Sequence, residues 1–209
     1  LRKENDSSYG SQESTRKEAY YLFNPSLRFA LSNSTGFRNP SLYETFDSTY
    51  GTRTLTPETT ETNRISISGK SKILNAGYSL NAYKSKISNL IASASGTYIY
   101  YNANGETNIS GIEGNINSQL GKKLFSNFGF ATTHKKTSDN KKNQLLPRYS
   151  LSGSFNYVID KNFNLNTNLT YSEGSYDTSK VELPSYTLVG LKGNFKINNK
   201  SQFNLLVVN

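Results

Sequence analysis

The chain has 209 residues and a formal net charge of +9, from 24 Lys and Arg against 15 Asp and Glu. It contains no Cys, which excludes disulfides, thiolate chemistry and Cys-based zinc sites. Mean hydropathy is −0.64 and no run of about 18 apolar residues occurs, which excludes a transmembrane helix but not a transmembrane barrel, because a barrel strand needs apolar residues only at alternate positions.

Alternation of apolar and polar residues predicts strands along most of the chain. Residues 1 to about 13 are polar and predict a loop. About ten segments with one apolar and one polar face follow, at 19–23, 27–32, 64–68, 76–82, 112–120, 124–131, 150–159, 163–171, 189–197 and 203–207.

The connections between these strands alternate in length. Short ones lie at 24–26, 70–74, 121–123, 160–162 and 198–200, and long ones at 36–57, 87–96, 134–146 and 173–184. Outer-membrane barrels have short turns at one end and longer external loops at the other, whereas a soluble sandwich or lectin has no reason for this alternation. The sequence therefore predicts an all-β fold, an antiparallel up-and-down meander of about ten strands that is part of a transmembrane β-barrel.

The polar face of the hairpin 150–171 supports the membrane barrel. It carries Ser, Asn and Thr rather than the Lys and Glu that are usual on the wet side of a soluble sheet, and such groups suit a water-filled barrel interior. Lys84 and Lys86 break the rule, since both fall on the apolar parity of the strand at 76–82. They require either a β-bulge or a position at the membrane rim, where long side chains can snorkel.

The charged residues predict neither nucleic-acid binding nor catalysis. Lysines occur in pairs at turns and loops, at 122–123, 135–136 and 141–142, and no RNA-binding motif gathers them. His134 is the only histidine and lies beside lysines at a loop mouth, so no catalytic relay is predicted. Calcium-loop and phosphate-loop spacings are missing, and we expect no enzyme activity, no cofactor and no metal.

The long loop from 36 to 58 resembles a family signature. The run from Gly36 to Glu44 (GFRNPSLYE), followed by Leu55 to Glu58 (LTPE), is similar to the barrel domain of TonB-dependent outer-membrane receptors. Further similar segments follow in the family's order, at Tyr83, 86–91, 101–102, 111–114 and 208–209. The resemblance covers essentially the whole chain.

Within this family the run from Ile87 to Glu113 looks most like the cobalamin receptors, as do 145–148 and 171–177. The resemblance implies TonB-dependent transport of a large scarce nutrient, cobalamin first and a ferric siderophore as the alternative. Its implied partners are outer-membrane lipid, the receptor's own plug domain and the TonB complex, at the outer membrane of a Gram-negative cell. The alternative from another class is a secreted β-rich binding or adhesion module.

The chain also departs from the complete family pattern. It contains no Met, so we expect a processed product or a fragment. No segment resembles the plug or the TonB-contacting segment, and the chain stops at Asn209 before a closing strand. Because transporters with a plugged lumen have about 22 strands, residues 1–209 are expected to be the C-terminal part of the barrel. A half-barrel with two unpaired edges is not expected to function alone.

Aromatic and Arg side chains in the loops are the candidate substrate contacts, since they offer stacking and hydrogen bonds to a large polar ligand. The candidates are Arg38, Tyr43, Glu44, Tyr50, Arg53, Tyr98 and Tyr100. A structural alternative exists for each loop. Phe37, Arg38 and Pro40 could fix the first loop against the wall, and Tyr98, Tyr100 and Tyr101 could belong to an interfacial aromatic girdle.

Overall fold

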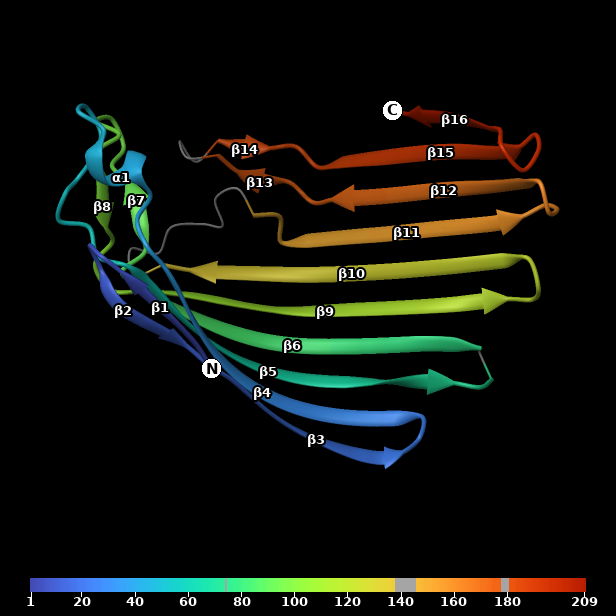
Figure 1. Ribbon diagram of the computed structural model, residues 1–209, viewed down its shortest axis with the longest axis horizontal. Coiled ribbons are helices and arrows are strands. Elements are labelled where there is room, and N and C mark those ends of the chain that lie inside the picture. Colours follow the sequence, from blue (N-terminus) through green and yellow to red (C-terminus); the bar gives the residue numbers. More distant parts are fainter. Residues whose placement is uncertain (74, 138–145, 178–180) are drawn as a thin grey trace.

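A computed structural model describes residues 1–73, 75–137, 146–177 and 181–209. Its main feature is a ten-stranded antiparallel sheet in which each strand lies beside the next barrel strand along the chain (Figure 1). In order the strands are β3 (Arg16–Asn24), β4 (Leu27–Arg38), β5 (Glu58–Ser71), β6 (Ala76–Ser88), β9 (Glu106–Leu120), β10 (Leu124–Lys136), β11 (Tyr149–Val158), β12 (Phe163–Ser172), β15 (Tyr186–Lys196) and β16 (Gln202–Val208). The predicted up-and-down meander is confirmed.

The short turns gather at one end of the sheet and the long connections at the other (Figure 1). Two of the long connections contain small hairpins, β7 (Ile91–Ser93) with β8 (Tyr100–Asn102), and β13 (Ser175–Tyr176) with β14 (Glu182–Leu183). The connection at 134–146 lies mostly outside the described residues, but β10 extends through Lys136. The predicted separation of turns from loops is thus observed wherever the structure describes the connection.

The predicted loop over residues 1–13 is wrong. It forms a hairpin of β1 (Arg2–Asp6) and β2 (Gly10–Ser14). The turn is stabilised by the Asp6 carboxylate, which accepts hydrogen bonds from the Ser8 and Tyr9 amides, and by Gly10 at φ 71°. Both strands are polar on both faces, so alternation could not reveal them.

Several barrel strands are longer at the loop end than alternation predicts. β5 begins at Glu58, β6 continues to Ser88 and β9 begins at Glu106. The backbone ladder continues there without the alternating apolar side chains that made the pattern visible, as in the pairing of Thr62 with Ser85. The strands therefore project beyond the apolar part of the sheet.

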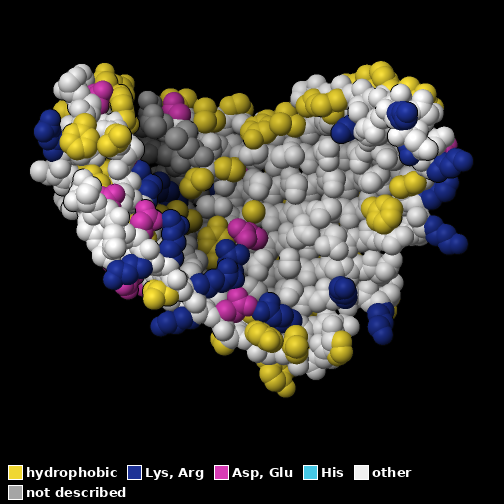
Figure 2. Space-filling view, in the orientation of Figure 1, with side chains coloured by type: hydrophobic (Ala, Val, Ile, Leu, Met, Phe, Trp, Pro, Cys, Tyr) yellow, Lys and Arg dark blue, Asp and Glu magenta, His cyan; other side chains and the backbone are white. Residues whose placement is uncertain are grey.

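The two faces of the sheet differ in chemistry. One face carries half-exposed large apolar side chains: Leu31, Ile65, Ile67, Leu80, Ile112, Ile116, Phe128, Phe130, Leu151, Leu169, Val189 and Leu191. We call this set of side chains the apolar belt, and the face that carries it the outward face. The other face, seen in Figure 2, has few hydrophobic side chains over the middle of the sheet. Such wide apolar exposure suits contact with lipid.

The described residues form almost no apolar core. Their buried apolar side chains are Ala30, Leu55 and Ala76. Since a sheet in lipid satisfies its backbone groups by strand pairing, the ladder, and not a packed interior, holds these strands together. β3 and β16 are the outer strands of the sheet and are not paired with each other, so the barrel is not closed within this chain. No helix in the described part of the chain has the length and apolarity to cross a membrane.

Lys84 and Lys86 lie on the outward face at the loop end of β6. The register of β6 with β5 and with β9 is continuous past both lysines, so the structure contains no bulge there. The continuous register excludes the bulge, so of the two explanations given by the sequence it favours the position at the rim.

Candidate ligand-binding loops

The first long loop is shaped by a short helix, α1 (Leu42–Phe46). Ser41 caps it, because its hydroxyl accepts a hydrogen bond from the Glu44 amide at 3.2 Å. The Glu44 carboxylate in return accepts one from the Ser41 amide at 2.7 Å, which completes a capping box. These residues lie in the segment that resembles the family signature. Ser41 and Glu44 of this segment therefore have a local structural role, because their capping box starts the helix that folds the loop back.

Arg38 ties this helix to the sheet. Its Nε and Nη2 donate to the two carboxylate oxygens of Glu58, both at 2.9 Å, and its Nη1 donates to Glu44 at 2.9 Å. Arg38 ends β4 and Glu58 begins β5, and the two are register partners. The Glu58 and Glu44 hydrogen bonds raise the pKa of Arg38 further above its ordinary value. Arg38 is fully engaged, which favours the structural role for this candidate.

Two residues that the sequence analysis did not select join the two long loops. Glu58 also accepts a hydrogen bond from the Ile91 amide at 2.7 Å. Asn102 accepts one from the Thr56 amide at 2.8 Å, and its Nδ2 donates to the carbonyls of Thr56, at 3.0 Å, and Asn89, at 2.7 Å. Loops 39–57 and 89–105 are therefore one connected unit. Glu58 ends the segment 55–58 that resembles the family signature, but only the register places it beside Arg38, so the sequence alone did not identify its role.

The candidate tyrosines meet across the two loops. Tyr43 and Tyr100 are in edge-to-face contact with ring centroids 6.1 Å apart, and Tyr50 and Tyr98 are at 6.3 Å. The Tyr100 amide donates to the Tyr50 carbonyl at 2.9 Å, and the Tyr100 carbonyl accepts from the Thr52 hydroxyl at 2.5 Å. The structure thus brings together residues that are about 50 positions apart in the chain.

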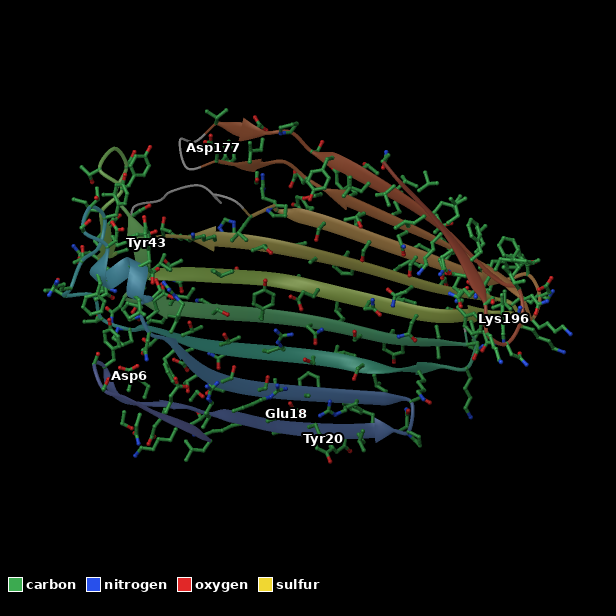
Figure 3. The ribbon with its side chains drawn as sticks, turned by 45° about the horizontal axis from the view of Figure 1, so that its top comes forward. Asp6, Glu18, Tyr20, Tyr43, Asp177 and Lys196 are labelled. Carbon is green, nitrogen blue, oxygen red and sulfur yellow. The ribbon has the colours of Figure 1, made fainter. Side chains whose placement is uncertain are left out.

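The outer surface of this unit is aromatic and apolar. Tyr43 is 53% exposed and Tyr98 63% exposed. The Arg53 guanidinium lies 5.6 Å from the ring of exposed Phe46. Tyr43 is at the loop end of the sheet and Lys196 at the opposite, short-turn end (Figure 3). Because Tyr98 belongs to the β7–β8 connection, which is outside the ten-stranded sheet, a girdle on the barrel wall does not account for it.

The inward face offers a polar surface below these loops. Asn115 and Asn127 on neighbouring strands are joined by their side-chain amides at 2.9 Å, and Asn194 donates to Asn164 at 2.6 Å. Arg64 also pairs with Glu113 at 3.5 Å. These groups remain available to water on one side. Within the described residues, no group of three or more His, Cys, Asp and Glu could hold a metal ion.

The fold and the candidate site together define a class of protein, the membrane β-barrels whose external loops present aromatic side chains. The family model for "TonB dependent receptor-like, beta-barrel" matches residues 8–209. The chain therefore belongs to this family, whose members lie in the outer membrane of Gram-negative bacteria. The predicted family is confirmed.

The curated relatives include vitamin B12 transporters. The chain is 34% identical to Vitamin B12 transporter BtuB of Vibrio cholerae over 113 residues, which cover 54% of this chain and 18% of that protein. It is 27% identical to Vitamin B12 transporter BtuB of Photobacterium profundum over 205 residues, covering 93% of this chain and 33% of the relative. The chain thus spans a third or less of the length of these relatives.

Solved structures agree with the fold. A mutant of the ferric enterobactin receptor PfeA from Pseudomonas aeruginosa matches with a TM-score of 0.79 at 16% identity, over 97% of this chain and 35% of that chain. The siderophore receptor PirA from the same species matches with a TM-score of 0.77 at 15% identity, over 97% of this chain and 37% of that chain. At these identities the likeness shows the fold alone.

Proposed function

We propose that residues 1–209 form the C-terminal part of the barrel of a receptor that actively transports cobalamin across the outer membrane in a TonB-dependent manner. The plug domain and the closing strand belong to the rest of the receptor. The observation that carries this proposal is the similarity to vitamin B12 transporters, which at 27% identity extends over 93% of the chain.

The geometry supports capture of a large ligand at the loop end. Tyr43 and Tyr98 present exposed rings from two loops that are hydrogen-bonded to each other. Rings fixed before binding lose little conformational freedom when a ligand packs on them. The inward Asn, Ser and Thr side chains then give a hydrated wall for passage after the plug has rearranged under the action of TonB. The chain supplies the conduit and performs no bond chemistry.

A ferric siderophore is the alternative cargo. Siderophore receptors share the fold at a TM-score of up to 0.79, and the aromatic loops suit a large polar ligand of either kind. A secreted binding or adhesion module is not supported, because the family model spans nearly the whole chain.

Uptake by cells that lack their own receptors tests the proposal. The complete gene is expressed, and uptake of labelled cobalamin and of a labelled ferric siderophore is measured with and without TonB. We expect TonB-dependent cobalamin uptake. Siderophore uptake alone would replace the cargo, and uptake of neither would refute both substrates.

A pair of tyrosine variants tests the loop site in the same cells. Tyr98→Ala is expected to weaken cobalamin binding about 2- to 10-fold, the usual value of one aromatic contact. Tyr157→Ala is the control, because Tyr157 is also an exposed tyrosine, at 45%, but lies in β11 near the short-turn end. Equal binding by both variants and the unmodified receptor would exclude Tyr98 as a ligand contact.

A further inference from the structure

The β1–β2 hairpin packs against the first long loop. Both lie at the loop end of the sheet, where Asp6 of the hairpin and Tyr43 of α1 are found (Figure 3). Asn39 donates from Nδ2 to the Asp6 carboxylate at 3.3 Å, and Tyr9 Oη lies 3.1 Å from Thr45 Oγ1. These contacts join positions that are 33 and 36 residues apart in the chain. The hairpin is therefore attached by its turn to the loop that contains α1.

The base of the hairpin is fixed to β4. Thr15 follows β2, and its carbonyl accepts a hydrogen bond from the Thr35 amide at 2.9 Å. The Thr15 amide in turn donates to the Thr35 hydroxyl at 3.0 Å. At the other end Asp6 shapes the turn, because the carboxylate that accepts from Asn39 also accepts from the Tyr9 amide at 3.0 Å. The hairpin is thus held at both ends, and its turn brings the Tyr9 hydroxyl to α1.

The Tyr9 hydroxyl is the donor in its contact with Thr45. Thr45 Oγ1 also lies 3.1 Å from the Ser41 carbonyl, which can only accept, so the single Thr45 hydroxyl proton is used there. The Thr45 oxygen then accepts the hydroxyl proton of Tyr9. Thr45 is 4% exposed and is the buried residue of α1. Loss of the Tyr9 hydroxyl would therefore remove a hydrogen bond at a place where bulk water has little access to replace it.

The helix α1 depends on such contacts because it is short. A helix of five residues is not stable on its own in water, and the capping box and Arg38 hold only its N-terminal end. Tyr43 and Thr45 are two residues apart, about 200° around a helix, so they face opposite sides. With Thr45 held inward, Tyr43 is exposed and its ring contacts Tyr100. A chain of contacts therefore runs from Tyr9 through α1 to the rings of the ligand-binding loops.

We propose that Tyr9 is a positioning residue of the ligand-binding loops, and that the β1–β2 hairpin is a strap that holds α1 in place. With the strap closed, the rings of Tyr43 and Tyr100 are ordered before the ligand arrives. When the hydrogen bond between Tyr9 and Thr45 opens, α1 and both rings gain freedom, and a ligand has to order them again. Tyr9 acts through α1, because it is half-buried and its hydroxyl is used by Thr45. The effect on ligand binding rests on the proposed function, whereas the strap itself does not.

Hydrogen exchange of the complete purified receptor without ligand tests the strap. In Tyr9→Phe, which loses only the hydroxyl, the backbone amides of the hairpin and of the loop 39–57 should both exchange about 2- to 10-fold faster, the usual value of one hydrogen bond. Tyr78→Phe is the matched control, because Tyr78 also donates a hydrogen bond, to the Ser26 carbonyl at 3.4 Å, but lies near the short-turn end. It should leave exchange in both segments unchanged. Faster exchange confined to the hairpin, or unchanged exchange in both segments of Tyr9→Phe, would overturn the proposal.

Two changes at Thr45 separate the hydrogen bond from the packing. Thr45→Val removes the hydroxyl at nearly constant volume and should speed exchange in the loop 39–57 at least as much as Tyr9→Phe does. Thr45→Ser keeps the hydroxyl and should restore most of the protection. Tyr9→Phe should add little to Thr45→Val, because both variants lack the same hydrogen bond. Fully additive effects would show that the two side chains act independently, which would overturn the strap.

The rates of cobalamin binding distinguish positioning from direct contact. A loosened loop lowers the fraction of receptor that is ready to bind, so Tyr9→Phe should slow association about 2- to 10-fold and leave dissociation unchanged. Faster dissociation with unchanged association would place Tyr9 in contact with the ligand and overturn its positioning role. If the unmodified receptor binds no cobalamin, the proposed cargo is wrong, and the exchange measurements, which contain no ligand, still decide the strap.

Discussion

Leu169 and Asn168 are neighbours in β12 that point to opposite faces of the sheet. Leu169 is 44% exposed on the outward face, where its register partners are Gly153 and Val189. Asn168 lies between Ser154 and Gly190 on the inward face. Replacing either residue by Asp adds the same charge, and Leu169→Asp also removes apolar side-chain surface. The pair therefore compares two environments at nearly the same depth in the membrane.

The expected penalties follow from these surroundings. An aspartate at position 169 has no cation among its register partners and faces lipid, where Lys or Arg costs about 2–4 kcal/mol at the bilayer midplane and acidic residues cost less. We expect about 1–2 kcal/mol for Leu169→Asp, which is about a 5- to 30-fold change in the folding equilibrium. Asn168→Asp remains in water on the polar face, and we expect a change within about 0.5 kcal/mol.

Folding into lipid vesicles measures the difference. The complete receptor carrying each change is refolded at a series of urea concentrations, and the folded fraction is read from the mobility of unheated samples. Equal penalties for the two variants would refute the assignment of the faces, and a larger penalty for Asn168→Asp would reverse it.

Three more predictions concern the loops and the ladder. Arg38→Ala leaves Glu58 and Glu44 side by side without their cation. The backbone amides of the loop 39–57 should therefore exchange hydrogen about 10-fold faster. An unchanged exchange rate would exclude the anchoring role of Arg38. Burial raises the pKa of Glu44, but the hydrogen bonds from Arg38 and Ser41 lower it more, to below its ordinary 4.5. Anchoring is therefore complete at neutral pH and should weaken only below pH 4.5, where the protection of the loop amides relative to their intrinsic exchange rate at each pH should fall; a loss of protection already at pH 6 would contradict this. Gly69→Ala places a methyl group against the Ser26 carbonyl and should lower folding stability by about 1–3 kcal/mol. Gly36→Ala is the control, because a methyl group there meets open space and should not lower stability. Equal stability of the two variants would show that β5 moves aside.

The candidate site shows where reasoning from sequence reaches its limit. Aromatic and charged residues in long loops identified Tyr43 and Tyr98, and the structure places them in one loop unit. Neither residue type nor spacing indicated that Asn102 would join the two loops, because its four hydrogen bonds go to backbone and hydroxyl groups of positions distant in the chain. The β1–β2 hairpin was missed for a related reason, since it is polar on both faces.

The sequence by itself determined the ten strands of the main sheet, their order and their two faces. Alternation of apolar and polar side chains is a local property, and a strand between lipid and water must show it. The tertiary structure alone decided which residues become neighbours across strands. Register placed Glu58 opposite Arg38 and aligned Lys17 with Lys84 in one row. Pairing between strands depends on backbone hydrogen bonds that every residue offers equally, so side-chain pattern does not encode such rows beyond the apolar belt.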